Sequence, residues 1–534
     1  MVRQLFSAHP SHNQVLMNRR LLCFQSVALA AWLALCLILP VQLQAAGFEQ
    51  AQWERQGWVT EWDAGMKRAR AAGKPAFVYF DAGWCSWCQQ YKRDVLDIPR
   101  VRAVLARDFI RVAVDFDARP DLMRRYGGKG LPFTLVLSPD GSVLGQFVGV
   151  IPAEDLVNLL ATLVRRSGRQ PELAREPGEV LHQPAALDRK SYAAFRAAYL
   201  RHLDSLYDPA RETISGQFES GVTYRRTSLL TWVYLMDHGL WKERVQRAAQ
   251  ADRKRLWDPV GKGYFNFVDS TRADYLESSK LLEINAWMAV RQAQAGVRDP
   301  RARQNAIEAW DYLRTVLWDK AHGGFFQSQL ADNAYYALPL PERLRKKAPP
   351  VDRAKRTDTN AQVVWALLHL SRFDGRKEVL DHAALTMDFL LREMWRDGRL
   401  YHLWRDGRLF SPDLPHSWFW VLAAGAELEQ VRPDRSRRER LAAISVVAGR
   451  WLEQRMRDVP AARIDNELAG LIARTAGRRD LYPRLPAGAR EWALSQLRIE
   501  TETPPDELVI GLWAWEVTLA GGLVIEGVVP GNGK

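Results

Sequence analysis

The chain has 534 residues, more than one ordinary hydrophobic core holds, so we expect two or three domains. Hydrophobic residues make up 47% and charged residues 26%, a balance that is typical of globular proteins and excludes an intrinsically disordered chain. The net charge is +13, but the basic residues are spread among 62 acidic ones, so we expect a solvated basic surface and no nucleic-acid partner.

The N-terminal segment, residues 1–46, has the order of a secretory signal peptide. Arg19 and Arg20 precede a hydrophobic run, and small residues follow it near Ala45 and Ala46. We therefore expect cleavage near Ala45 or Ala46 and a periplasmic or secreted protein. The hydrophobic run is nearly long enough to span a bilayer, so an uncleaved anchor in the inner membrane is the alternative.

Residues 47–165 alternate between strand and helix patterns. The predicted elements are, in chain order, a helix at Trp62–Ala72, a strand at Pro75–Phe80, a helix at Cys85–Leu96, a strand at Phe109–Phe116, a short helix at Asp121–Tyr126, strands at Leu131–Gly141 and Ser142–Gly149, and a helix at Ala153–Val164. This is the element order of a thioredoxin-like α/β domain. Polar, proline-bearing residues 166–188 follow and predict a linker.

From residue 189 to residue 534 we expect strands to stop and an all-α domain to begin. Eleven segments have helical periodicity: Tyr192–Leu206, Thr227–His238, Lys242–Leu256, Tyr275–Gln294, Ala302–Leu317, Thr359–Phe373, Val379–Met394, Ser417–Leu428, Arg438–Arg455, Asp465–Thr475 and Ala489–Leu497. A loose repeat joins them, with "LWDPVGKGYFNF" from Leu256, "LWDKAHGGFFQS" from Leu317 and a weaker "MWRDGRLYHLW" from Met394. Repeated helical hairpins predict an (α/α)6 toroid, and an open solenoid is the alternative.

The stretch "WCSWC" holds the candidate redox centre. Cys85 and Cys88 follow a strand and begin a helix, where unpaired N–H groups and a partial positive charge stabilise a thiolate. We expect Cys85 to attack disulfides and Cys88 to resolve the mixed disulfide, with no cofactor beyond this redox-active pair. The neighbouring Trp84 and Trp87 are expected to contact the substrate.

Two other roles for the cysteine pair are open. As half of a zinc site it would need further ligands, but the chain offers no second CxxC and no paired Cys/His group, so we predict no metal. As a structural disulfide it would close a loop of only two residues and gain little entropy. Both roles are weaker hypotheses than redox activity.

Pro132 supports the redox hypothesis. In a thioredoxin-like fold a cis proline begins the strand that faces the CxxC motif, and the backbone before it, here Leu131, pairs with an extended substrate. An ordinary proline at the start of a strand is the alternative.

Thioredoxins also carry a buried acid six residues before the first cysteine. Tyr79 has that place here, and we expect Asp81 to point differently, which leaves proton transfer to Cys88 in doubt.

The whole chain resembles the spermatogenesis-associated thioredoxin-like family, in which a thioredoxin-like domain precedes a six-hairpin-glycosidase-like toroid. The family's "EKMLYDNA" motif corresponds to "SSKLLEINA" from Ser278, its "DxKxxTxWNA" to "DRAKRTDTNA" from Asp352, and its "LDDYA" to "LPHSW" from Leu414. The toroid motifs are eroded, so the chain looks like a distant, exported member. The resemblance implies the two-domain fold and carries no settled chemistry for the toroid.

The toroid offers only weak candidates for a second site. Glycoside hydrolysis needs two carboxylates across a pocket, and the candidates are Asp274, Glu277, Glu283, Asp352 and Asp358. We expect these acids to be helix caps or surface groups, and most of the 21 tryptophans to fill the core. His238 and His416 are expected to be hydrogen-bonded residues at helix ends. A speculative pocket at predicted helix starts comprises Lys280, Asn285, Asp358 and Asn360.

The leading hypothesis is therefore an exported thiol–disulfide oxidoreductase whose helical toroid binds a client or partner. Its expected partners are a protein thiol or disulfide client and a membrane electron donor or acceptor. The alternative is a carbohydrate-binding or carbohydrate-processing toroid with an accessory CxxC domain.

Overall fold

The structure, a computed structural model, describes residues 48–128, 130–166, 179–214, 216–217, 223–226, 229–269, 275–458 and 464–520. The predicted signal peptide and most of the predicted linker lie outside these residues. Within them, no helix has both the length and the apolar character needed to cross a membrane. The end of the predicted linker forms strand β5 (Val180–His182), which pairs with β19 (Ile499–Glu500).

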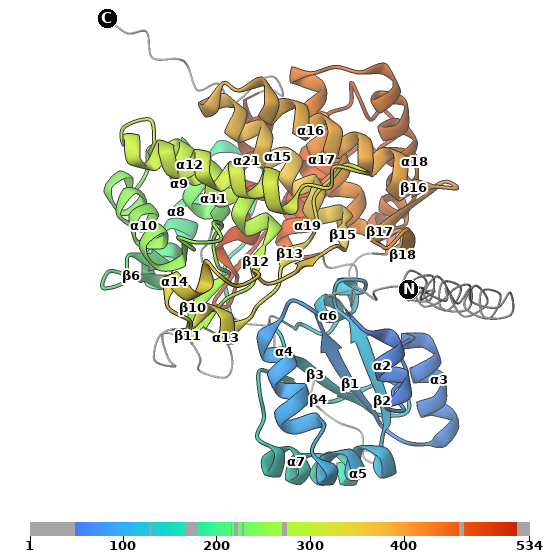
Figure 1. Ribbon diagram of the computed structural model, residues 1–534. Coiled ribbons are helices and arrows are strands. Elements are labelled where there is room, and N and C mark those ends of the chain that lie inside the picture. Colours follow the sequence, from blue (N-terminus) through green and yellow to red (C-terminus); the bar gives the residue numbers. More distant parts are fainter. Residues whose placement is uncertain are drawn as a thin grey trace, which may run out of the picture. The chain divides into compact units, whose positions relative to one another are not determined.

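A four-stranded sheet forms the centre of the N-terminal domain (Figure 1). It contains β1 (Ala76–Asp81), β2 (Ile110–Asp115), β3 (Phe133–Leu137) and β4 (Val143–Val148) in the order β2-β1-β3-β4. Strand β1 pairs with β2 in parallel and with β3 antiparallel. Every residue of β1 is buried, because helices cover both faces of the sheet.

Different helices cover the two faces. One apolar layer joins the sheet to α2 (Gln50–Arg55), α4 (Ser86–Tyr91), the π-helical turn η1 (Lys92–Leu96), α5 (Pro99–Asp108) and α7 (Ala153–Arg166). The other joins it to α3 (Trp62–Ala72) and α6 (Pro120–Arg125). The sequence did not predict α2 or α5. In α5 only Val101 and Leu105 are buried, so its apolar stripe is too narrow to stand out.

In the described part of the second domain, an inner ring consists of α9 (Leu229–Asp237), α11 (Leu282–Ala295), α15 (Thr357–Asp374), α17 (Pro415–Val431), α19 (Asn466–Ala476) and α21 (Pro505–Leu519). Each of these helices packs on the next, and α21 packs on α9. The ring is therefore closed, which confirms the toroid and excludes the open solenoid.

Outer helices surround this ring, each packed on at least one inner helix (Figure 1). They are α8 (Arg189–Leu206), α10 (Lys242–Leu256), α12 (Pro300–Tyr312), α16 (Lys377–Phe389), α18 (Arg435–Arg457) and α20 (Ala489–Ser495). Because an outer helix returns the chain between successive inner helices, the inner helices run in one direction and begin at the same end of the ring.

Three sequence expectations about this domain were wrong. Helix α21, which closes the ring, was not predicted, because it is apolar on nearly every side and has no helical periodicity. Helix α11 begins at Leu282 and not at Tyr275, since the preceding residues form β11 (Tyr275–Glu277) and β12 (Lys280–Leu281). Strands also continue after residue 189, but most span only two to five residues, too few for an alternating pattern to be read.

Aromatic side chains of the inner helices pack against one another. The ring centroid of Trp365 lies 5.6 Å from that of Trp420 and 6.0 Å from that of Trp513, and His369 lies 5.9 Å from Trp287. All five side chains are buried in one continuous core. The tryptophans that we name here thus fill the core, as predicted.

The two stronger sequence repeats fold in the same way. In the first, Lys280 donates to Asp258 at 2.7 Å and Asn285 binds both backbone groups of Tyr264. In the second, Lys355 donates to Asp319 at 2.6 Å. There, Asn360 binds both backbone groups of Phe325. A lysine and an asparagine at the start of an inner helix therefore fix the preceding hairpin.

Glycine ends the turn of each repeat for a physical reason. Gly263 and Gly324 have φ angles of +79° and +71°. A Cβ atom on Gly263 would lie 2.8 Å from the ring of Tyr312, and one on Gly324 would lie 2.7 Å from the ring of Phe389. Only glycine fits a left-handed turn at this distance from an outer helix.

We predict that Lys355→Met lowers the free energy of unfolding by about 3–5 kcal/mol, because it leaves Asp319 buried without its cation. Lys377→Met is the matched control, since Lys377 is 85% exposed and its pairing with Asp381 should contribute less than about 1 kcal/mol. Chemical denaturation of both variants measures the difference, and equal losses would contradict a structural role for the buried pair.

Candidate active site at the CxxC motif

The cysteine pair lies where β1 ends and α4 begins. Cys85 is the N-cap residue of α4, with an extended backbone, and its Sγ atom accepts a hydrogen bond of 3.1 Å from the N–H of Cys88. The two sulfurs are paired, and the Cα atoms lie 5.3 Å apart. Unpaired N–H groups at the start of a helix favour negative charge, so this position suits a Cys85 thiolate when the pair is reduced.

Tyr79 and Asp81 lie beneath the pair. Side chains alternate along a strand, so these two residues share the face of β1 that carries the CxxC layer. The Tyr79 hydroxyl donates to the Cys88 carbonyl oxygen at 3.0 Å, and the Trp53 indole N–H donates to Asp81 at 3.2 Å. Our expectation that Asp81 points differently was therefore wrong.

The environment of Asp81 favours its neutral form. The side chain is buried, and burial raises its pKa to about 6, although Lys92 and the Trp53 N–H act in the opposite direction. A carboxyl group with this pKa can hold or accept a proton near neutral pH. The domain thus contains a buried acid on the same face of β1 as Tyr79, which the six-residue spacing rule did not locate.

Pro132 and Leu131 have the geometry that we predicted for them. The Leu131–Pro132 peptide bond is cis, and Leu131 packs against the same apolar layer as the cysteines. The carbonyl oxygen of Pro132 accepts a hydrogen bond from Gly149, which ties the start of β3 to the end of β4. Whether Leu131 pairs with an extended substrate stays a prediction.

The two tryptophans of the motif contact different parts of the chain. The Trp84 indole N–H donates to the Asp117 carboxylate at 3.2 Å, and its ring packs against the core of the toroid. The Trp87 ring lies 4.6 Å from that of Tyr275 in β11. Between the cysteines, the Ser86 hydroxyl donates to Glu277 and lies 2.8 Å from the Tyr275 hydroxyl. The toroid therefore contacts the motif directly.

A buried charge network surrounds this contact. Asp115 is the last residue of β2, beside Asp81 at the CxxC end of β1, and Asp117 follows it; both pair with toroid arginines. Arg405 binds Asp115 at 2.8 Å, and Arg356 lies 3.5 Å from Asp117. Asp352 is also buried, and burial together with the nearby Asp117 raises its pKa to about 7. The two domains thus share a network in which arginines compensate most of the buried carboxylates.

The candidate acids of the toroid are more buried than we predicted. Glu277, Asp352 and Asp358 are each no more than 2% exposed, so the expectation of surface acids was wrong for these three. Burial raises the pKa of Glu277. The pKa of Asp358 is lowered in spite of burial, because Arg356 binds it at 2.7 Å. Asp274 lies outside the described residues.

The speculative pocket residues are separated by their contacts. Lys280 and Asn285 belong to the first repeat and Asn360 to the second, and each binds the hairpin of its own repeat. Asp358 binds Arg356, and its Oδ1 lies 3.9 Å from Nε2 of the buried His402. These side chains act in the packing of the ring, and the structure gives them no shared ligand-binding arrangement.

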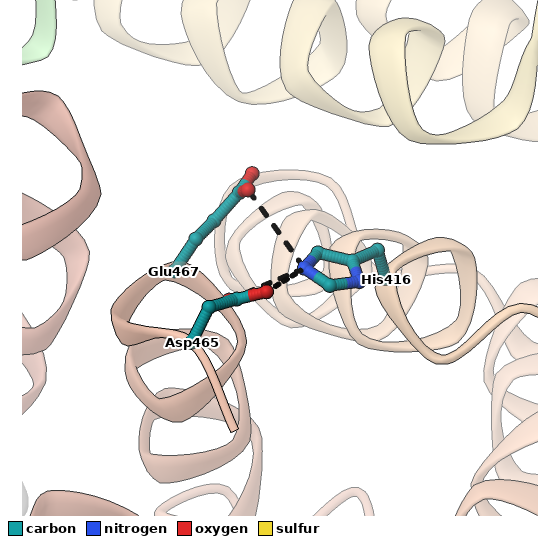
Figure 2. Close-up of side chains that lie close together, drawn as sticks. All are labelled: His416, Asp465 and Glu467. Atoms are coloured by element: carbon teal, nitrogen blue, oxygen red, sulfur yellow. Dashed lines mark hydrogen bonds and ion pairs between the residues drawn. The ribbon is translucent and has the colours of Figure 1, made fainter. Parts of the chain in front are cut away.

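One cluster in the described residues could hold a metal ion. His416, Asp465 and Glu467 each offer a ligand atom, and these atoms lie within 4.8 Å of one another (Figure 2). His416 already binds Asp465 at 3.0 Å, and Glu467 pairs at 3.5 Å with Arg124 of α6. The guanidinium of Arg124 supplies positive charge beside these carboxylates, so we interpret the cluster as an ion-pair network between the domains.

Both predicted helix-end histidines are hydrogen-bonded, as expected. His238 follows α9 and contacts the Tyr234 carbonyl oxygen at 2.8 Å and Glu516 at 3.0 Å. His416 lies in the first turn of α17 and binds Asp465, as described above. Neither position requires a ligand to explain it.

Sequence reasoning missed the roles of Ser86, Tyr275, Asp117 and Arg356. No local motif marks them, since each acts on a residue far away in the chain. Asp81 could have been found, because the period of two in β1 places it on the face of Tyr79.

Comparisons with known proteins agree with the two-domain description. Residues 57–139 match the thioredoxin-like family model. Spermatogenesis-associated protein 20 of Homo sapiens is 23% identical over 351 residues, which cover 58% of this chain and 41% of that protein. The chain thus spans less than half of that relative. Thiol:disulfide interchange protein DsbD 1 of Pseudomonas aeruginosa is 32% identical over 122 residues, 22% of this chain and 20% of its own.

Among solved structures, the chain is similar to a D-mannose isomerase, with 12% identity and a TM-score of 0.48 over 63% of this chain and all of that one. It is also similar to the cellobiose 2-epimerase of Spirochaeta thermophila, with 15% identity and a TM-score of 0.45 over the same shares. The resemblance expected from the sequence is confirmed: the chain joins a thioredoxin-like domain to a helical toroid and is similar to spermatogenesis-associated protein 20.

Proposed function

We propose that the protein is an exported thiol–disulfide oxidoreductase that acts through Cys85 and Cys88. The observation that carries this proposal is the position of the pair, with Cys85 as N-cap of the helix that follows β1. The match of residues 57–139 to the thioredoxin-like family model and the similarity of 122 residues to a thiol:disulfide interchange protein support protein clients. The signal-like order of residues 1–46 supports export.

In the reducing direction, the Cys85 thiolate attacks one sulfur of a client disulfide. The client S–S bond breaks, a mixed disulfide forms, and the released client thiolate takes a proton. Cys88 then loses its proton and attacks the Cys85 sulfur, so the client leaves as a dithiol and the chain keeps the disulfide. A dithiol donor at the membrane restores the reduced pair with two electrons. Oxidation of clients is the same sequence in reverse.

Asp81 is our candidate for the proton acceptor of Cys88. It is hydrogen-bonded to Trp53, which packs in the same buried layer as Cys88, and its pKa of about 6 allows it to take a proton and return it near neutral pH. Tyr79 occupies the position where thioredoxins carry this acid, but its hydroxyl is engaged with the Cys88 carbonyl oxygen. Asp81, two residues further along the same face, would supply the missing function.

The carbohydrate alternative receives less support. Bulky side chains of Trp365, Trp420 and Trp513 pack together between the inner helices of the ring. Two of the acids that could serve hydrolysis are also engaged, since Asp358 binds Arg356 and Glu277 binds Ser86. The redox hypothesis uses side chains that are already arranged for it.

Cys85→Ser is expected to reduce insulin-reductase activity to background, because the attacking thiolate is lost. Cys88→Ser should instead accumulate mixed disulfides between Cys85 and client proteins, visible on non-reducing gels. Cys23→Ser and Cys36→Ser are matched controls, since both lie in the predicted signal peptide. Full activity of Cys85→Ser would refute the proposal.

Asp81→Asn tests the raised pKa through stability. Asp81 binds a proton up to about pH 6 in the folded chain but only to about pH 4 when unfolded. Stability therefore falls as the pH rises from 4 to 6, by about 3 kcal/mol at most. Asp81→Asn removes this loss. The free energy of unfolding of the variant should therefore rise relative to that of the wild type as the pH increases from 4 to 7. Parallel curves from denaturation at each pH would contradict the assignment.

A further inference from the structure

The cysteine pair is closed off from solvent in this structure. Cys85 is 4% exposed and Cys88 is fully buried. Thiol–disulfide exchange requires an incoming sulfur to reach Cys85 and displace Cys88. Some part of the covering surface must therefore move before the proposed reaction can begin, and a strand of the toroid directly contacts the two residues between the cysteines.

Strand β11, which we call the rim strand, contacts both residues between the cysteines. Tyr275 and Glu277 lie two positions apart, so their side chains project from the same face of the strand. The ring of Tyr275 packs at a tilt against that of Trp87, with centroids 4.6 Å apart, and its hydroxyl lies within hydrogen-bond distance of Ser86. Glu277 accepts a hydrogen bond from Ser86. The rim strand thus binds the CxxC loop through an aromatic ring and a carboxyl group.

The rest of the toroid holds the rim strand in this place. Asn333 donates to the Tyr275 hydroxyl at 2.7 Å, and Ser278 donates to Asn333 at 2.8 Å. Glu277 also pairs with Phe267 of β10 (Phe267–Asp269). The contact is therefore part of a small sheet of the toroid and not an isolated side chain that happens to touch the motif.

We propose that the rim strand occupies the client-binding surface of the CxxC motif and that exchange requires its release. This inference rests on the proposed function and extends it, because it makes the toroid an internal competitor of protein clients. A client takes the place of the rim strand by laying an extended segment over Ser86 and Trp87. Clients with an aromatic residue two positions before an acidic one reproduce the contacts of Tyr275 and Glu277 and are favoured.

Tyr275→Ala tests the inference through the rate of exchange. An aromatic pair contributes enough free energy that its loss should raise the open fraction, and with it the rate at which dithiothreitol reduces the Cys85–Cys88 disulfide, by about two- to tenfold. Tyr207→Ala is the matched control. Tyr207 also packs its ring against a tryptophan, Trp241, and donates a hydrogen bond to a glutamate, Glu212, but these contacts lie within the toroid. Its rate should equal that of the wild type.

A second measurement leaves the rim strand unmutated. In Cys88→Ser, the Cys85 thiolate attacks one sulfur of oxidised glutathione, the glutathione S–S bond breaks, and one glutathione leaves as a thiolate. The glutathione bound to Cys85 should displace the rim strand, so backbone amides of residues 275–281 should exchange hydrogen faster than in unmodified Cys88→Ser. Unchanged exchange in this segment would overturn the inference.

The outcomes separate the two proposals. If the wild type reduces insulin and Tyr275→Ala is no faster than the wild type or Tyr207→Ala, the rim strand does not control access and this inference fails alone. If dithiothreitol reduces the disulfide but neither the wild type nor Tyr275→Ala reduces insulin, the proposed function fails. A faster reaction of Tyr275→Ala with dithiothreitol and insulin supports both.

Discussion

The hydrogen bond between Ser86 and Glu277 connects the two domains of this protein at the CxxC motif. Ser86 lies between the cysteines, and Glu277 belongs to the toroid, so the spacing residues of the CxxC motif are held by the other domain. Tyr275 adds a ring contact with Trp87. Because these contacts lie between the cysteines in sequence, the toroid forms part of the immediate surroundings of the disulfide.

Charge compensation supports this contact. The carboxylates at the end of β2, Asp115 and Asp117, would be costly to bury alone, and Arg405 and Arg356 of the toroid pair with them. In a further pair the cation belongs to the thioredoxin-like domain and the carboxylate to the toroid: Arg124 pairs with Glu467. Opposite charges on both sides of the contact fix its register, so the two domains meet with the CxxC end of the sheet facing the toroid.

Much of the fold could be predicted from the sequence. Helix α3 was predicted at its observed bounds, and the glycine-aromatic repeats indicated hairpins whose lysine and asparagine prove to be structural. Helix α21 could not be found in this way, because a helix buried on all sides has no amphipathic period. Strands β11 and β12 were missed because two or three residues carry no readable alternation.

The candidate site, like the fold, could be predicted only in part. Cys85, Cys88 and Pro132 belong to local motifs, and the structure gives them the geometry that those motifs indicate. The face of β1 on which Asp81 lies was predicted wrongly, although the period of two along the strand places it with Tyr79. Tyr275 and Glu277 act on residues almost two hundred positions away, and no local pattern records such a contact. The polar residues Lys280, Asn285 and Asn360 looked like a site because they stand at predicted helix starts, but each binds the backbone of a hairpin.

The reduction potential of the Cys85–Cys88 pair, measured by equilibration with glutathione, tests the central claim most directly. Our account predicts a reversible couple between about −120 and −270 mV, the range of working oxidoreductases. The value within that range would also indicate whether clients are oxidised or reduced. A pair that stays oxidised below about −300 mV would be a structural disulfide and would contradict the account.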